Sequence, residues 1–330
     1  MLLTYDGRDY ELRPGESVLE AMSRQGVSLP SACRAGSCQA CLVRSVRGDP
    51  GAEAGRGLKP AWRAAGYFLA CVARPAGDLA VAGPGEDTRT PGRLASVGTA
   101  GPGVLRVHVR PDRPLRYRAG QHVALGLAGV VRIYSIANLP AEAARDGLEL
   151  HVRVFRSGMM SGRLARAAPG DPVTLGTPAG DCWYPPAGED GGGARETGPL
   201  LLAGTGTGIA PLLAIARAAV ADQYPGPVAL LHGAARAEGL YLGRSVPAAL
   251  ARQARAGGTA VSWRTCVLGE GADIADAALA EVRRLGADPG RARACLCGGP
   301  GSVRRMRRGL FLAGLPLAAI GADQFVPAGC

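Results

Sequence analysis

Four cysteines in the first quarter of the chain have a spacing suited to an iron–sulfur cluster. Cys33, Cys38 and Cys41 follow the pattern C-x4-C-x2-C, and Cys71 follows after 29 further residues. Four thiolates are what two irons with bridging sulfides require, and this spacing is one of those that hold a 2Fe-2S centre. Zinc usually takes two C-x2-C pairs, and only one is present here, so a zinc site is the weaker alternative.

A glycine-rich segment further along can hold a phosphate group. The sequence GTGTGIAP lies between an apolar stretch and an Ala-rich stretch that predict a strand and a helix. Glycines let the backbone approach a pyrophosphate, and the N-terminus of the following helix favours its negative charge. The segment has a proline where the common dinucleotide fingerprint has glycine. The candidate residues are Gly204, Gly206, Thr207, Gly208 and Pro211.

The elements that must position these residues divide the chain into three units. Residues 1–84 predict a small α+β unit with a hairpin at Asp6-Gly7 and a helix opened by the capping box Ser17–Glu20. Residues 82–96 are rich in Gly and Pro and predict a linker. Alternating, β-branched runs in residues 97–187 predict an antiparallel β-barrel. Strands alternating with helices in residues 198–330 predict a parallel α/β sheet.

Composition excludes several classes of protein. The chain has 330 residues, 47% of them hydrophobic, and 38 basic residues against 27 acidic ones. Basic and acidic residues are interspersed and aromatics make up 5%, so the stacking surfaces of a nucleic-acid-binding protein are not expected. The longest uncharged stretch, residues 197–216, contains the glycine-rich segment and is a poor membrane span. The start of the chain lacks the apolar core of a signal peptide, and we expect a soluble cytoplasmic protein.

The motifs together resemble a known family. The segments SACRAGSCQACLV and GYFLACVARP are similar to a plant-type ferredoxin domain, and the rest is similar to the ferredoxin-NADP reductase superfamily. The order of the motifs resembles the reductase components of bacterial ring-hydroxylating dioxygenases, including those of naphthalene dioxygenases. The resemblance covers nearly the whole chain. It implies a ferredoxin (β-grasp-like) domain, an FAD-binding barrel and an NAD(P)-binding α/β domain.

The resemblance assigns two segments to FAD. Alone they would be interpreted as an ordinary barrel strand and an ordinary serine cap. In the family, the arginine of R-x-Y-S meets the FAD pyrophosphate, the tyrosine stacks near the flavin, and the serine hydroxyl reaches flavin N5. The motif G-x-x-S precedes a short helix, expected here at residues 162–168, that meets the pyrophosphate. The matching residues are Arg132, Tyr134, Ser135, Gly158, Met160 and Ser161.

The resemblance also implies the nicotinamide site. In the family the cysteine of C-G-x-P lies beside nicotinamide C4, and the glycine leaves room for the ring. The residues that match this motif are Cys297, Gly298, Gly299 and Pro300. Phe325, in the ending Asp-Gln-Phe, would cover the flavin ring. Arg236 could meet a 2′-phosphate and Glu238 a ribose hydroxyl, so NADPH stays possible, but the resemblance favours NADH.

The expected function is electron transfer. Nicotinamide gives two electrons as a hydride, a 2Fe-2S cluster accepts one at a time, and FAD can do both. The resemblance therefore implies an NAD(P)H-dependent reductase that serves a separate oxygenase or its ferredoxin. Residues 1–84 carry ten basic and eight acidic residues, which predicts an acidic docking patch on the partner. Two alternatives stay open: a reductase for a deoxysugar dehydrase (CDP-6-deoxy-glucoseen reductase type) and a zinc-bearing basic protein without redox activity.

Overall fold

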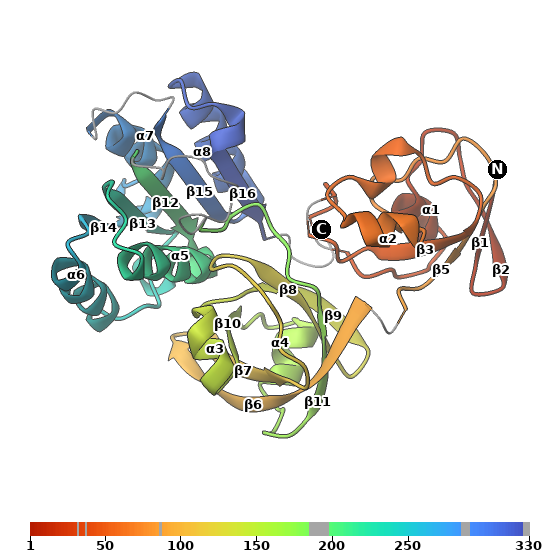
Figure 1. The fold of residues 1–330 in the computed structure, drawn as a ribbon, viewed down its shortest axis with the longest axis horizontal. Coiled ribbons are helices and arrows are strands. Elements are labelled where there is room, and N and C mark those ends of the chain that lie inside the picture. The colour runs from red at the N-terminus through yellow and green to blue at the C-terminus, as the bar shows by residue number, and fades with distance from the viewer. Residues whose placement is uncertain (32, 37, 86–87, 185–197, 285–290, 326–330) are drawn as a thin grey trace.

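Three β-sheets follow one another along the chain, and each forms the centre of one unit (Figure 1). The computed structural model describes residues 1–31, 33–36, 38–85, 88–184, 198–284 and 291–325. The predicted order of an α+β unit, an antiparallel unit and a parallel α/β unit is confirmed. The predicted ends at 187 and 330 lie outside the described residues.

The first sheet has the strand order β2-β1-β5-β3-β4. Its strands are β1 (Leu2–Tyr5), β2 (Arg8–Glu11), β3 (Leu42–Arg47), β4 (Tyr67–Leu69) and β5 (Leu79–Ala82). Helix α1 (Val18–Arg24) begins with the predicted capping box, in which the Ser17 side chain accepts from the backbone N–H of Glu20. The first turn of α1 also donates to the carbonyls of Ala70 and Ala73. These bonds tie α1 to the segment that carries Cys71. The short helices η1 (Ala52–Gly55) and α2 (Pro60–Ala64) complete the unit.

The second sheet is antiparallel, with the order β10-β7-β6-β11-β8-β9. Its strands are β6 (Arg89–Gly101), β7 (Val104–Pro111), β8 (His122–Leu127), β9 (Val130–Ser135), β10 (Leu148–Arg153) and β11 (Pro172–Gly176). A bridge between Ile136 and Leu150 brings the two edges of the sheet together. Helices α3 (Pro140–Asp146) and α4 (Met159–Leu164) lie beside it.

The predicted linker at 82–96 was wrong from Arg89 onward, because β6 begins there. The Gly and Pro content of this segment favoured a linker, yet Gly92 has a packing role inside the strand. A Cβ on Gly92 would lie 2.7 Å from the carbonyl oxygen of Arg110 on β7. The glycine therefore lets two strands approach closely, which composition alone does not reveal.

The third sheet is parallel throughout, with the order β14-β13-β12-β15-β16. Its strands are β12 (Leu200–Thr205), β13 (Val228–Ala234), β14 (Val261–Val267), β15 (Arg293–Gly298) and β16 (Ile320–Gln324). Two helices pack on each face: α5 (Ile209–Ala221) and α6 (Ser245–Gly257) on one, α7 (Ile274–Arg284) and α8 (Pro300–Leu312) on the other. Strand β16 was not predicted. Among the described residues, no helix combines the length and apolar character that crossing a bilayer requires.

The second and third units meet along a close contact. A Cβ on Gly101, at the end of β6, would lie 2.1 Å from the carbonyl oxygen of Tyr241 in the third unit. The Tyr241 hydroxyl and Nδ1 of His151 share a hydrogen bond of 2.7 Å, and Nε2 of His151 lies 2.8 Å from the Glu149 carboxylate. Tyr241 and His151 are both buried. The close backbone contact and the hydrogen bonds that link the Tyr241, His151 and Glu149 side chains therefore hold these two units together.

Candidate functional site

The cysteine loop of the first unit turns its backbone N–H groups toward sulfur. The N–H groups of Ala35 and Cys38 donate to Sγ of Cys33 at 3.4 and 3.3 Å, and the N–H of Cys33 donates to Sγ of Cys38 at 3.4 Å. Positive φ angles at Arg34 (53°) and Gly36 (82°) curl the loop in this way. Such bonds stabilise negative charge on sulfur, as cluster ligands require.

The four predicted ligands come together as two pairs. A hydrogen bond with the Cys33 thiol, together with burial, raises the pKa of Cys38. A hydrogen bond with the Cys71 thiol likewise raises the pKa of Cys41, and the same bond lowers the pKa of Cys71. Cys33 is half-buried, and the other three are buried. Two pairs of thiols match two irons with two thiolates each, so these residues fit a 2Fe-2S cluster.

One of the predicted flavin residues of β9 has an unsatisfied hydroxyl. Ser135 ends β9 and is buried, and its Oγ has no hydrogen-bond partner among the described residues. Burial raises the pKa of the neighbouring Tyr134, so its phenol stays neutral. Arg132 uses one guanidinium N–H on the carbonyl of Val131, at 2.7 Å. A buried hydroxyl without a partner calls for a polar ligand atom, which fits a flavin ring.

The second flavin segment forms the first turn of a helix. Helix α4 begins at Met159, so the predicted helix at 162–168 was placed three residues too late. Gly158 is its N-cap, and a Cβ there would lie 2.4 Å from Oγ of Ser161. Ser161 accepts from the N–H of Phe155 and donates to the carbonyl of Gly158, each at 3.2 Å. Met160 is buried in the core of the second sheet.

The glycine-rich segment and the C-G-G-P segment lie against each other at the carboxyl ends of β12 and β15. A Cβ on Gly208 would lie 2.5 Å from the carbonyl oxygen of Cys297, and one on Gly298 would lie 2.1 Å from Oγ1 of Thr205. Thr205 also accepts from the N–H of Gly299 at 3.2 Å. Ligands of parallel sheets bind outside the carboxyl ends of the strands, so this edge suits a dinucleotide.

The remaining nucleotide residues take the predicted order around this edge. Gly204 lies in β12, Gly206 and Thr207 form a 3-10 turn with Gly208, Pro211 is in the first turn of α5, and Pro300 opens α8. Arg236 and Glu238 lie exposed in the turn after β13. These residues therefore all lie at the carboxyl-end edge of the sheet, with the two glycine segments.

One cation at this edge was not predicted from the sequence. Arg153 ends β10 of the second unit, and its Nη2 lies 3.5 Å from where a Cβ on Gly206 would be. Its guanidinium thus reaches over the glycine-rich segment of the third unit. A lone arginine after a strand has no distinctive spacing, so only the packing of the two units reveals it.

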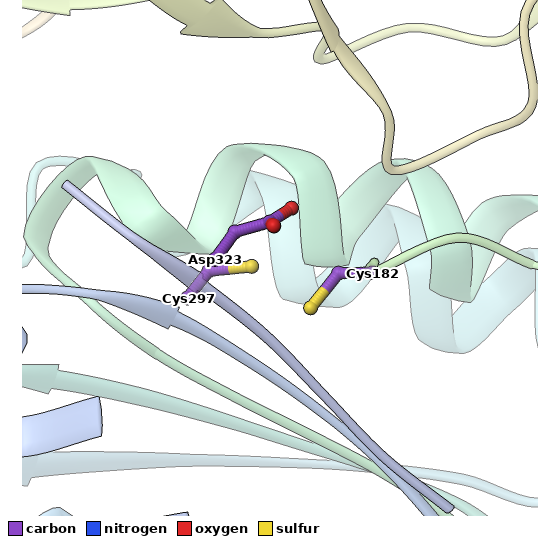
Figure 2. A group of neighbouring side chains, drawn as sticks. All are labelled: Cys182, Cys297 and Asp323. Carbon is purple, nitrogen blue, oxygen red and sulfur yellow. The ribbon is translucent and has the colours of Figure 1, made fainter. Parts of the chain in front are cut away.

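Cys297 lies in a group of buried polar side chains (Figure 2). Sγ of Cys297, Sγ of Cys182 and a carboxylate oxygen of Asp323 all lie within 4.8 Å of one another. Burial raises the pKa of Cys297, so its thiol is neutral. Phe325 is half-buried and donates its N–H to the carbonyl of Gly298 at 2.7 Å. The predicted nicotinamide residues Cys297 and Gly298 are therefore neighbours of Phe325, which was predicted to cover the flavin.

His122 connects the three units. It faces Ser135 in the register of β8 and β9, and its Nδ1 lies 3.6 Å from Oδ2 of Asp323. Burial acts to lower the pKa of His122, but the hydrogen bond and charge of Asp323 outweigh it and raise the pKa. The thiol of Cys33 and the backbone of Cys38 act in the same direction. The cysteine loop therefore lies next to the flavin and nicotinamide residues.

Comparisons with known proteins agree with this arrangement. Three family models match: the 2Fe-2S iron-sulfur cluster binding domain at residues 3–76, the oxidoreductase FAD-binding domain at 103–184, and the oxidoreductase NAD-binding domain at 202–306. An aromatic O-demethylase reductase subunit from Amycolatopsis sp. is 38% identical over 72% of this chain and 73% of its own.

Two further relatives cover nearly the whole chain. The reductase component of naphthalene 1,2-dioxygenase/salicylate 5-hydroxylase systems from Ralstonia sp. is 27% identical over 96% of this chain and 95% of its own. The crystal structure of the Amycolatopsis cytochrome P450 reductase GcoB covers 99% of both chains, with a TM-score of 0.64 and 30% identity.

The fold and the three sites define an oxidoreductase with 2Fe-2S, FAD and NAD domains in one chain. The chain belongs to the family of NADH-dependent flavin and iron–sulfur reductases that serve as reductase components of oxygenase systems.

Proposed function

We propose that this chain takes a hydride from NADH and delivers single electrons to a separate oxygenase or its ferredoxin. The observation that carries the proposal is the position of His122, beside Ser135, Asp323 and the cysteine loop at once. When bound, FAD would convert the two-electron chemistry of nicotinamide into the one-electron chemistry of the cluster. The residues of the three units then need only hold the groups close together.

Several of the predicted residues have a defined role in this proposal. Arg132 and the turn around Ser161 hold the FAD pyrophosphate, Tyr134 lies against the flavin, and Ser135 supplies a hydrogen bond to N5. Arg153 joins the glycine-rich segment in binding the dinucleotide pyrophosphate. Cys297 lies beside the nicotinamide as a neutral thiol, and Phe325 covers the flavin. Exposed Glu238 favours NADH by accepting from the ribose hydroxyl, against the attraction of Arg236 for a 2′-phosphate.

The domain ranges follow the sheets. We assign residues 1–84 to the ferredoxin domain and 198–330 to the nucleotide domain, and we move the start of the FAD domain from 97 to 88 because β6 begins at Arg89. We further propose that the protein works in the cytoplasm, where its thiols stay reduced.

The composition of the protein as isolated tests this function. We expect one FAD and two irons per chain, in line with a single 2Fe-2S centre. Under anaerobic conditions NADH should bleach the flavin and cluster absorbance, and kcat/KM should be higher for NADH than for NADPH. A colourless protein that holds zinc would contradict the proposal and favour the basic zinc-binding alternative.

The partner is proposed to carry an acidic patch. Arg34 is exposed in the cysteine loop, and Arg44 and Arg47 are exposed on β3, the strand that follows the loop. Charged rims chiefly raise association rates, and salt screens them over about 10 Å at 0.1 M. Arg34→Glu should lower oxygenase-coupled turnover and leave NADH–ferricyanide turnover unchanged. Arg255→Glu, on the exposed face of α6, is the matched control. If salt and Arg34→Glu leave coupled turnover unchanged, docking does not use this face.

A further inference from the structure

A group of thiols lies at the junction of the second and third units. Cys182 belongs to the segment between β11 and β12, whereas Cys295 and Cys297 alternate along β15 and face the same core. Asp323 is opposite Cys297 in the register of β15 and β16. Figure 2 shows Cys182, Cys297 and Asp323 coming from these separate segments, with the two sulfurs pointing toward each other and the Asp323 carboxylate beside Cys297. Their donor atoms lie within 4.8 Å of one another.

The group is closed to bulk water and includes an unsatisfied oxygen. Cys182 and Cys297 are 0% exposed and Asp323 is 5% exposed. Oδ1 of Asp323 accepts from the N–H of Asp181 at 3.4 Å. Oδ2 makes no hydrogen bond among the described residues, and Nδ1 of His122 lies 3.6 Å from it. His122 therefore offsets part of the charge of this buried carboxylate, and a bound cation would complete the coordination of Oδ2.

We propose that Cys182, Cys297 and Asp323 bind one soft or borderline divalent cation, Zn²⁺ or Cd²⁺. Two sulfurs and one oxygen select such an ion over Mg²⁺ or Ca²⁺. Around Zn²⁺, with bonds of about 2.0 to 2.3 Å, tetrahedral ligand atoms are about 3.5 to 3.8 Å apart. The observed group therefore needs to contract by only about 1 Å. Burial raises the pKa of both thiols, so only an ion with high thiolate affinity displaces their protons.

Binding of this ion has a consequence that rests on the proposed function. Cys297 is the residue proposed to lie beside the nicotinamide, and Asp323 is paired with His122. An ion held by Cys297 and Asp323 would fix the thiol that the nicotinamide ring must meet and would compete with His122 for the Asp323 carboxylate. The site is therefore inhibitory, and the ion and NADH exclude each other.

Metal counting tests the site independently of activity. The full-length protein with FAD and cluster is equilibrated with Cd²⁺, dialysed, and analysed for cadmium, iron and flavin. We expect one cadmium per chain with unchanged iron and flavin. Cys182→Ser, which keeps the volume but removes the soft donor, should weaken cadmium binding by at least about tenfold. Cys266→Ser, at a buried thiol on β14, is the control and should bind like the unaltered protein.

The possible results distinguish cation binding at this site from the exclusion of nicotinamide by the cation. Equal cadmium binding by Cys182→Ser and the unaltered protein would overturn the site. If Cd²⁺ binds but does not raise the KM for NADH in the ferricyanide assay, the site stands and the exclusion of nicotinamide is overturned. Absence of NADH–ferricyanide turnover before any metal is added would instead contradict the proposed function. Asp323→Asn, assayed by cadmium binding alone, should also weaken the site.

Discussion

The molecule holds two groups of cysteines, and their surroundings differ more than their chemistry. In the ferredoxin unit, Sγ of Cys33 accepts from two backbone N–H groups of a curled loop. At the junction of the other units, Sγ of Cys182 instead donates to the carbonyl of Leu296 at 3.5 Å. The first environment stabilises negative sulfur and the second a neutral thiol. Proximity of thiols is thus common to both groups, and the backbone around the sulfur decides which of them suits a cluster.

Removal of one sulfur from each group should give the largest contrast. Cys38→Ser takes a ligand from the loop, so we expect loss of both irons with retention of FAD. Cys295→Ser changes a buried thiol of the other group, so iron and flavin should both stay. Iron analysis and the visible spectrum measure this difference. Loss of iron in Cys295→Ser as well would show that the two groups are not independent.

Acid should affect the unit with the buried thiols before the ferredoxin unit. Burial lowers the pKa of His232 to about 4, below its unfolded value of 6.5. The unfolded chain therefore binds this proton first, and stability falls as pH drops from about 6.5 to 4, by at most about 3 kcal/mol. In the ferredoxin unit, a hydrogen bond from Arg24 lowers the pKa of Glu16 to about 2, so its stabilisation is lost only below pH 4.5.

Thermal unfolding between pH 7 and 4 measures this order of acid sensitivity. The transition of the nucleotide unit should shift down before that of the ferredoxin unit. His232→Leu removes the titrating group and should flatten the pH dependence of the nucleotide unit. An unchanged pH dependence in His232→Leu would assign the effect to other groups.

Truncation in the buried group should cost stability without affecting the cluster. Cys295 is 1% exposed on β15, and Cys295→Ala leaves a small cavity. We expect a loss of about 1 to 2 kcal/mol in the stability of the nucleotide unit. Urea unfolding followed by tryptophan fluorescence measures it, since Trp263 lies on β14 of the same sheet. No loss of stability would mean that neighbouring side chains collapse into the space.

The smallest effect is expected at the cap of α1. Ser17→Ala removes the acceptor for the N–H of Glu20 and should cost about 1 kcal/mol. Because the first turn of α1 donates to the carbonyls of Ala70 and Ala73, on either side of the Cys71 segment, the variant should also lose iron faster to a chelator. Ser23→Ala, at the opposite end of α1, is the control. Equal chelation rates would separate the cap from the cluster.

The two groups of cysteines also differ in how far the sequence predicts them. The loop ligands are close in sequence, so their spacing alone indicated a cluster. Cys182 and Cys297 are brought together only by the packing of two units, which periodicity does not encode. For the same reason Arg153 was missed, while the alternation of strands and helices in the α/β unit, whose local apolar pattern is strong, was predicted except for β16. The linker prediction was wrong for residues 89–96 because Gly92 allows a close contact between two strands there.

The contact between Gly101 and Tyr241 has an evolutionary consequence. Any side chain at position 101 would collide with the backbone carbonyl of Tyr241, and the Tyr241 hydroxyl needs His151 as its partner. An ancestor that acquired a new nucleotide domain by recombination would have had to change both sides of this contact together. The FAD and nucleotide domains are therefore expected to be inherited as one module, whereas the ferredoxin domain, joined through the short segment before β6, can be exchanged between lineages alone.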